Sequence, residues 1–468
     1  MKSILQRDLT VAVPPGISVQ GRPAEAGSNA LAGYTALEDA TVVRRLREAG
    51  ARLRDSGCTS EFGFGLSDGQ PGVLQPQPAA KEVGERGAGA AAGEVAVTGA
   101  GVSTGEVAVT GAGASTDDPD AADAELVVDF MGESRLAAAR ASIYGFKPSY
   151  GLVSRSGLIG LIPSMECCGI VSGSLNAIGE VLRTVAGRDG LDFAMPEEDM
   201  PGFSPRAVDP GEITIGIITE AQGEPAPRGS LGEPAPGGAG SSQAAEGAEG
   251  FRACVEELKR LGFTLREVSL PGFALFSLVH RIVGSVEASS AAGRYDSVRY
   301  GPRAPGAKNW NEMYLMSRGA AFGTLVKSYL IQGAFFQFER YEAFVDACRI
   351  RARLVEDMRR LESQADFFVL PIGGSPAQGA GGAQGAGGGA GAPAPSAGEG
   401  PSAAPASLAD VYAEFASTLF ANVTGQPALY LPPAPGSSRT GFHLTGPRLC
   451  DGRLLDLGRL ISESRGGE

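Results

Sequence analysis

Apolar residues follow two different spacings in the middle of the chain. The almost uninterrupted apolar run at 213–218 predicts a buried strand, and the run at 263–268 predicts a second one. Between them, apolar residues recur at helical spacing from Phe251 to Leu261, and Gly262 would end that helix. A strand, a crossover helix and a strand in this order predict a parallel pair within an α/β sheet.

Similar patterns lie on both sides of this unit. Residues 11–13 predict a short strand, and Asp39 is placed to cap a helix that ends at Gly50. A long amphipathic helix is predicted around 338–354, leading into a strand at 367–370. The core positions expected on that helix are Phe338, Tyr341, Val345, Cys348 and Leu354. The whole predicts an α/β fold, a mixed sheet core covered by helices.

Three stretches break these patterns, at about 67–124, 221–250 and 374–407. They are rich in Gly, Pro, Ala and Ser, and the first contains a twelve-residue repeat at 93–104 with a near copy at 105–116. Because they have few large apolar residues, burial cannot offset the entropy cost of ordering them. We predict disordered low-complexity insertions within one domain that spans 1–468.

Charge and hydropathy limit the classes of partner. The formal net charge of −13 opposes a broad surface for nucleic-acid phosphates, so neither DNA nor direct RNA binding is expected. The arginines between 349 and 360 would instead lie on a solvated helix face. No signal peptide and no window of about 20 apolar residues is present, which predicts a cytoplasmic protein without membrane contact.

The residues that usually hold metals are few and scattered. Six cysteines and two histidines show no metal-ligand spacing, and no glycine run has the arrangement of a phosphate-binding loop. No cofactor or metal is therefore expected in this chain. The adjacent Cys167 and Cys168 are either a functional thiol pair or small buried core residues, and the second interpretation is favoured.

Two motifs resemble a known family. Residues 144–158 (YGFKPSYGLVSRSGL) resemble the run GLKPTYGxVSRxGL of the amidase signature family. Residues 287–301 (EASSAAGRYDSVRYG) are similar to EASSNLxRYDGVRYG, which is characteristic of the A subunit of glutamyl-tRNA(Gln) amidotransferase. Weaker matches support the register at 39–50, at 317–327, and at Asn422, Gly425 and Pro427.

The resemblance implies both a fold and a role. It implies the amidase-signature fold, and a subunit that hydrolyses glutamine to supply ammonia for converting Glu-tRNA(Gln) to Gln-tRNA(Gln). It also implies B and C partner subunits, with tRNA contacted only indirectly through a partner.

The catalytic positions of the family are not matched. The family uses a Ser-Ser-Lys triad in which one serine attacks, a second relays a proton and a lysine is the base. Pro14 stands at the lysine position, in a run similar to IAIKDN, and no serine occurs at 83–86, where the relay serine is expected. An ungapped match of SDTGGSIRQPA to 128–138 places Glu133 at the nucleophile, and a one-residue slip places Ser134 there.

Other positions in the resemblance are also changed. Met131 and Glu133 replace glycine and serine in the loop whose backbone N–H groups would form an oxyanion hole. The arginine that holds the glutamine carboxylate corresponds to Ser328 or Tyr329, and the aspartate for the α-amino group corresponds to Phe415. A free amino acid that binds in a buried pocket needs a partner of opposite charge or a hydrogen-bonding partner for both its carboxylate and its α-amino group.

These changes leave three hypotheses. The leading one is a non-catalytic scaffold subunit, in effect a pseudoenzyme, that still binds the B and C subunits. The second is a stand-alone amidase with a site rebuilt around Ser134, using Lys147 or a carboxylate as its base. The third is a decaying gene product whose repeats record drift.

Overall fold

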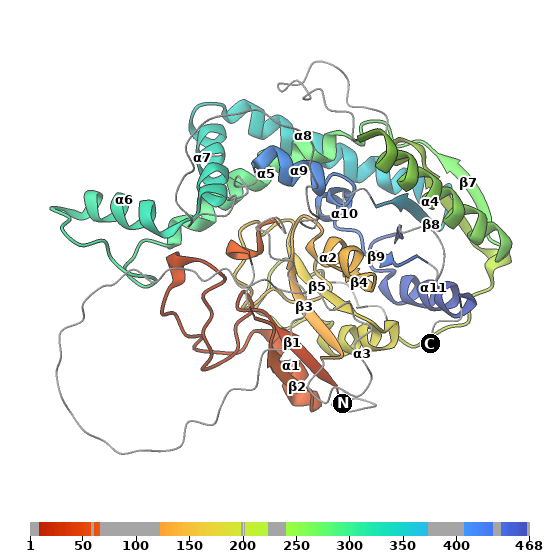
Figure 1. Ribbon diagram of the computed structural model, residues 1–468, viewed down its shortest axis with the longest axis horizontal. Coiled ribbons are helices and arrows are strands. Elements are labelled where there is room, and N and C mark those ends of the chain that lie inside the picture. The colour runs from red at the N-terminus through yellow and green to blue at the C-terminus, as the bar shows by residue number, and fades with distance from the viewer. Residues whose placement is uncertain are drawn as a thin grey trace, which may run out of the picture.

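Strands from distant parts of the chain meet in one mixed sheet. The computed structural model of the protein describes residues 9–57, 60–65, 122–197, 200, 202–222, 240–372, 407–433 and 441–465. Within these residues ten strands lie side by side in the order β2-β1-β3-β5-β4-β9-β10-β8-β6-β7 (Figure 1). The predicted α/β class, a mixed sheet covered by helices, is confirmed.

The strands are four to six residues long. Their bounds are β1 Thr10–Val13, β2 Arg52–Asp55, β3 Ala124–Asp129, β4 Tyr144–Lys147, β5 Cys167–Ser172, β6 Thr214–Ile218, β7 Thr264–Val268, β8 Phe367–Pro371, β9 Ala428–Leu431 and β10 Phe442–Thr445. The helices of the described residues are α1 Thr41–Ala49, α2 Glu133–Ala141, α3 Leu175–Val185, α4 Gly240–Arg260, α5 Leu275–Ala291, α6 Trp310–Ala321, α7 Thr324–Phe338, α8 Tyr341–Leu361, α9 Leu408–Glu414, α10 Leu419–Thr424 and α11 Asp451–Ser464.

Parallel pairs form both ends of the sheet, and antiparallel pairs join them. At one end β1 is parallel to β2 and β3, and at the other β6 is parallel to β7 and β8. The predicted parallel pair is therefore confirmed, with α4 as the crossover between β6 and β7. Between the two ends, β3, β5, β4, β9, β10 and β8 pair antiparallel.

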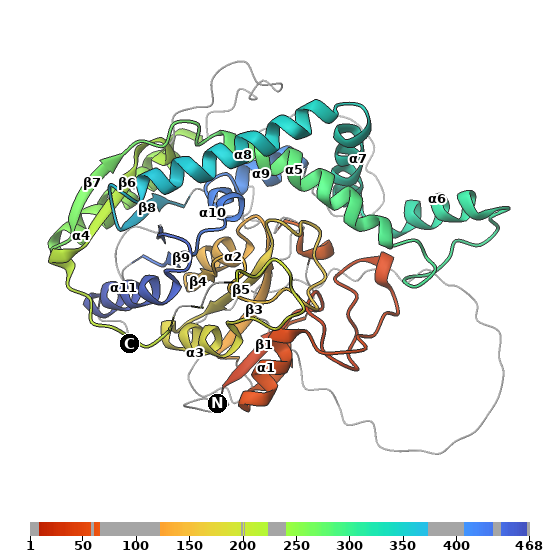
Figure 2. The same ribbon diagram turned by 180° about the vertical axis from the view of Figure 1, so that it is seen from behind.

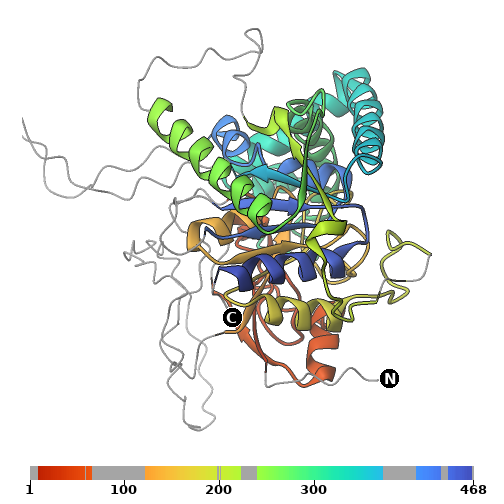
Figure 3. The ribbon, with the colours of Figure 1, turned by 90° about the vertical axis from the view of Figure 1, so that its right-hand side faces the viewer.

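Helices cover both faces of the sheet (Figure 3). On one face α1, α3 and α11 lie next to one another, and on the other α2 packs against β3, β4, β5 and β9. The α3 sequence shows why this layer forms: Ser174 caps its first turn, and Ile178, Val181 and Leu182 share a fully buried face. A second group, α5, α7, α8 and α10, packs together beyond α2.

Helix α6 stands apart from this body. Figures 1 and 2 show it projecting from the end of α5 as part of an arm, together with the segment that precedes it. Asn309 caps α6 by accepting a hydrogen bond from the backbone N–H of Glu312, and only Met313 and Ser317 of the helix are buried. The arm is thus held at its base and presents most of its side chains to solvent.

The predicted helix around 338–354 is two helices. Helix α7 ends at Phe338 and α8 begins at Tyr341, after Arg340, whose backbone is not helical. Phe338 and Tyr341 are exposed rather than in the core, and Leu354 is the predicted position that is fully buried. The apolar spacing continues through both helices. The turn between them, however, leaves the first residues of this pattern, Phe338 and Tyr341, on the surface.

Two further sequence predictions were wrong in part. Asp39 does not cap α1; it accepts a hydrogen bond from the backbone of Gln20 and pairs with Arg47, and Ala40 takes the cap position. The segment 221–250 is not irregular throughout, because α4 already begins at Gly240. The helix formers Gln, Ala and Glu continue the Phe251 pattern towards the N-terminus.

The rest of the predicted insertions, including the repeat at 93–116, lies outside the described residues, apart from their boundary positions. Ala124 already belongs to β3, and Ser407 caps α9 through a capping box with Asp410. In the part of the chain that the structure describes, no helix is long and apolar enough to cross a membrane.

Candidate active site

The loop after β3 and the loop after β1 leave the sheet at the same edge. Strand β3 continues through Phe130, Met131 and Gly132 into α2, while β1 is followed directly by Pro14. Since β1 and β3 are parallel neighbours, Pro14 lies close to the carboxyl end of β3, and it is buried. A proline at this point has neither an amine nor a backbone N–H to offer.

The carboxyl group of Glu133 lies in this loop. The backbone N–H groups of Phe130, Met131 and Gly132 all donate to its Oε2, at 2.8, 2.8 and 3.0 Å. Its other oxygen, Oε1, is buried and has no hydrogen-bond partner among the described residues. Burial and the neighbouring Asp129 raise the pKa of Glu133 to about 8, while the backbone N–H groups act in the opposite direction.

Glycine is required in this loop by space as well as by conformation. Gly132 has a φ of +125°, and a Cβ added there would lie 2.3 Å from Thr418. The Thr418 hydroxyl in turn contacts the carbonyl oxygen of Met131 at 2.5 Å. The loop is therefore fixed from two sides, by Glu133 on its N–H groups and by Thr418 on a carbonyl group.

A buried polar network sets the register of α2. Asn422 donates to Asp129 Oδ1 at 2.8 Å and accepts from Arg135 Nη2 at 2.6 Å, and Arg135 Nη1 donates to the carbonyl of Thr418 at 2.9 Å. The side chains of Asp129 and Arg135 are fully buried. Both charged side chains thus have hydrogen-bonding partners, which buried charges require.

Ser134 belongs to this network and points into the core. Its hydroxyl and its backbone N–H both donate to Asp129 Oδ2, the latter at 3.1 Å. The residue is 0% exposed, and a Cβ added at Gly169 would lie 2.7 Å from its Cβ. Gly132 and Glu133, which precede Ser134 in the chain, are buried as well. The hydroxyl is turned away from any approach by a substrate.

Lys147, the base of the rebuilt-amidase hypothesis, is on β4. Its Nζ donates to the carbonyl of Pro148 at 2.9 Å, and its side chain is buried. Burial lowers the pKa of this amine. The nearby Cys167 and Cys168 are buried as well, and burial raises the pKa of the Cys167 thiol to about 12. Both cysteines are core residues, in line with the favoured interpretation.

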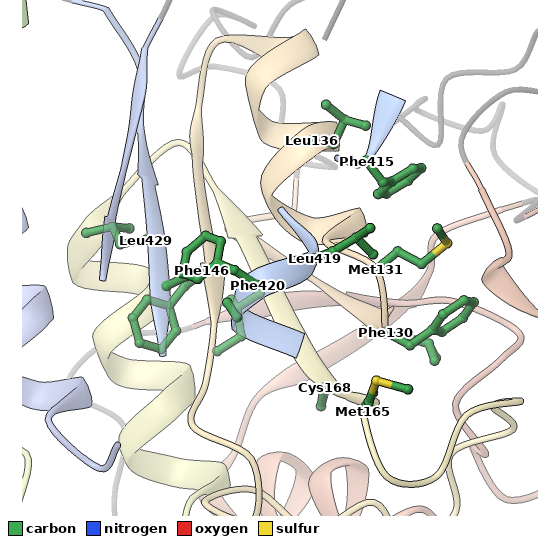
Figure 4. Packing of buried hydrophobic residues seen from close by; sticks show 14 of the residues in the cluster. Phe130, Met131, Leu136, Phe146, Met165, Cys168, Phe415, Leu419, Phe420 and Leu429 are labelled. Atoms are coloured by element: carbon green, nitrogen blue, oxygen red, sulfur yellow. The ribbon is translucent and has the colours of Figure 1, made fainter. Parts of the chain in front are cut away.

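Aromatic side chains fill the space beside the loop. Phe64 stacks on Phe130 with ring centroids 5.9 Å apart, and Tyr329 lies 4.6 Å from Phe64. The Tyr412 hydroxyl lies 3.1 Å from that of Tyr329 and 2.9 Å from His280 Nδ1. Figure 4 shows Met131 and Phe130 among further apolar side chains, including Leu419 and Phe415.

His280 completes this cluster. Its Nε2 lies 2.8 Å from the carbonyl of Phe130, which can only accept, so Nε2 carries the proton. Burial lowers the pKa of His280 to about 4, so the ring is neutral at pH 7 and Nδ1 is an acceptor. The histidine serves to hold the loop backbone and is not exposed to a substrate.

The two glutamine-recognition positions offer no charge. Ser328 is exposed, and its hydroxyl donates to the carbonyl of Thr324 one turn earlier in α7. Phe415 is fully buried. Tyr329, which neighbours Ser328 in the sequence, is the residue that points inward. The positions where the relay serine was expected, 83–86, lie outside the described residues.

Sequence reasoning missed the role of Glu133 as a ligand of its own loop, and it missed the cluster of His280, Tyr329 and Tyr412. The spacing of these three gave no signal, because they come from three separate helices. No group of three or more potential metal-ligating side chains gathers in the described part of the chain.

The sequence pattern of the amidase family matches residues 128–231 and 239–455. The chain belongs to the amidase family. This match begins at Val128, near the end of β3, and includes the loop, α2 and Asn422.

Relatives of this amidase-family chain include A subunits of glutamyl-tRNA(Gln) amidotransferase. The A subunit of Natronomonas pharaonis is 29% identical over 472 residues, covering 97% of this chain and 95% of the relative. That of Lactobacillus gasseri is 30% identical over 385 residues, covering 80% and 71%.

Solved structures show the same fold. The A subunit from Thermotoga maritima has a TM-score of 0.64 at 18% identity and covers 98% of this chain and 85% of its own. A crystal structure of an amidase has a TM-score of 0.59 at 20% identity, with coverage of 97% and 84%. The predicted amidase-signature fold is thus confirmed.

Proposed function

We propose that this chain is an A-subunit-like component of a glutamyl-tRNA(Gln) amidotransferase that acts as a non-catalytic scaffold for partner subunits. One observation carries the proposal: the Glu133 carboxyl group takes up the backbone N–H groups of Phe130, Met131 and Gly132. Amide hydrolysis needs such donors free, because they stabilise the oxyanion that forms on the substrate carbonyl.

The other chemical requirements are also unmet at these positions. A nucleophile must be within hydrogen-bond reach of a base and accessible to the substrate. Ser134 is bonded to Asp129 inside the core, Pro14 cannot act as a base, and Lys147 donates to a backbone carbonyl. This geometry favours the scaffold over the rebuilt amidase.

Exposed apolar side chains on and between α5, α6 and α7 support a surface for partners. Among the described residues thirteen large hydrophobic side chains are exposed, and ten of them lie between 275 and 341. They include Trp310 and Leu315 on the arm and Ile331 and Phe338 on α7. An apolar concentration of this kind is characteristic of an interaction site.

The charge of the arm indicates what kind of partner it takes. Four exposed basic residues precede or begin it, Arg294, Arg299, Arg303 and Lys308. They stand out in a chain whose net charge is −13. We infer that the arm contacts an acidic, partly apolar surface of a B or C subunit, and that tRNA binds through that partner in the cytoplasm.

The test is co-expression of the full chain with candidate B and C subunits, followed by co-purification and a glutaminase assay. We expect a stable complex that releases no ammonia above background. The A subunit of Lactobacillus gasseri with its own partners serves as the positive control. Ammonia release that disappears in Ser134→Ala would favour the rebuilt amidase, and absence of any complex would contradict the scaffold.

A further inference from the structure

The loop between β3 and α2 has the features of a binding site for one carboxyl group. We propose that the backbone N–H groups of Phe130, Met131 and Gly132 form a carboxyl-binding nest whose resident ligand is the carboxyl group of Glu133. The nest takes small external carboxylates when that side chain is shortened. Glu133 is then a positioning residue for the loop, a role that goes beyond the proposed scaffold function and does not depend on a partner.

The geometry of the nest supports a single oxygen as its ligand. Three successive N–H groups converge on Oε2 at 2.8 to 3.0 Å. Successive N–H groups aimed at one point form an anion-binding concavity, and the N-terminus of α2 adds its positive end. Thr418 and the positive φ of Gly132 hold the backbone in the conformation that brings the donors together.

A second observation supports the role of the Glu133 carboxyl group as the acceptor for the three N–H groups of the nest. Oε1 of Glu133 is buried without a hydrogen-bond partner among the described residues. Burying a polar oxygen in this way costs stability. The cost is offset at Oε2, since without it three buried N–H groups would have no acceptor.

The size of the expected ligand follows from the side chain. Glu133→Ala keeps Cβ and removes two carbons with the carboxyl oxygens, which together have the size of acetate. Acetate should therefore fit the space that the substitution leaves, and trimethylacetate should be too large. Because the site is buried, binding is measured best as stabilisation of the native state.

The experiment compares the thermal denaturation of full-length variants in sodium acetate, sodium trimethylacetate and sodium chloride at equal ionic strength. We expect Glu133→Ala to melt several degrees below the wild type, and acetate to restore part of this loss in proportion to its concentration. Trimethylacetate should give the same melting temperature as chloride. The wild type should respond equally to all three salts.

Glu125→Ala is the matched control. Glu125 is also a buried glutamate, on β3, but it lies outside the nest. Its variant should lose stability and gain none from acetate. If acetate and chloride give Glu133→Ala the same melting temperature, or if acetate rescues Glu125→Ala equally, the inference is wrong.

A second variant keeps the test decisive if Glu133→Ala does not fold. Glu133→Gln retains a carbonyl oxygen that can accept the three N–H groups, so it should fold and melt well above Glu133→Ala. A glutamine variant that is as unstable as the alanine variant would overturn the inference. Neither result bears on co-purification with partners, so failure of the nest and failure of the scaffold are distinguishable.

Discussion

The loop at 130–135 and the surface at 275–341 differ in how they satisfy their side chains. In the loop, the backbone donors are bonded to Glu133 Oε2 and the Ser134 hydroxyl is bonded to Asp129, and Glu133 and Ser134 are buried. On the surface, ten large apolar side chains face solvent without cover. The loop is thus closed around its own side chains, whereas the surface leaves its apolar side chains open to solvent.

The largest expected effect uses the same substitution in both kinds of environment. Ile215 on β6 is 0% exposed and Ile331 on α7 is 69% exposed. Ile215→Asp buries an unpaired charge and should cost more than about 3 kcal/mol or prevent folding, whereas Ile331→Asp should stay within about 0.5 kcal/mol. Urea unfolding of both variants measures this. Equal losses would show that the α7 face is covered within the chain.

The next effect concerns the arm alone. The double variant Trp310→Glu with Leu315→Glu should weaken binding of the partner subunits by about tenfold or more, because buried aromatic and apolar anchors dominate interfaces. Its melting temperature should be unchanged, since both side chains are exposed. The readout is the amount of partner retained in co-purification.

Phe193→Glu provides the control for that experiment. Phe193 is exposed as well but lies outside the α5–α7 surface. It should retain the partner at the wild-type level. If Phe193→Glu and the arm variant lose partner equally, the contact does not depend on the arm.

The sequence specified the ends of the sheet better than its centre. The apolar run at 213–218 became the buried strand β6, because a buried parallel strand needs a continuous apolar run. The more polar segment at 263–268 became β7, an edge strand whose side chains are mostly exposed. Phe338 failed as a core residue because apolar spacing tells which positions share a face and not whether that face is covered inside the chain. A face kept apolar for a partner has the same pattern as a core.

For the site, the ungapped match placed Glu133 at the nucleophile position, but the role of its carboxyl group became clear only from the structure. The convergence of three N–H groups on Oε2 depends on the backbone of Gly132, and sequence alone does not give that backbone. Likewise the sequence left Ser328 and Tyr329 open as the recognition position, and the structure shows that Ser328 is exposed and Tyr329 is buried. A one-residue shift on a helix changes the direction of a side chain by about 100°.

A smaller effect is expected on the pH dependence of the free energy of unfolding, which should differ between a buried and an exposed carboxyl group. Burial raises the pKa of Glu125 from 4.5 to about 8, so the folded state holds its proton more tightly than the unfolded state. The stability that this group contributes is fully present below pH 4.5 and is lost as the pH rises towards 8.

Glu125→Gln should therefore flatten the fall in free energy of unfolding across this range. Glu256→Gln, an exposed position on α4, should keep the wild-type slope. Chemical unfolding at a series of pH values checks both variants. An unchanged slope in Glu125→Gln would mean that its carboxyl group is solvated in the folded state.

The smallest expected effect is on turnover. Ser134→Ala should leave ammonia release from glutamine at background, with or without partners, because the hydroxyl is bonded to Asp129 inside the core. An ammonia assay on wild type and variant measures this. A glutamine-dependent rate in the wild type that the variant lacks would show that the loop opens to a substrate.

The order of strands in the sheet also determines when the protein can finish folding. Strands β9 and β10, at residues 428–445, lie between β4 and β8 and are the link through which the two ends of the sheet pair. Until these residues leave the ribosome, β4 and β8 each have an unpaired edge. The nascent chain carries the open edge of β4 from residue 147 onwards and adds that of β8 at residue 371, which makes its late stages the period of greatest exposure to aggregation and to chaperones.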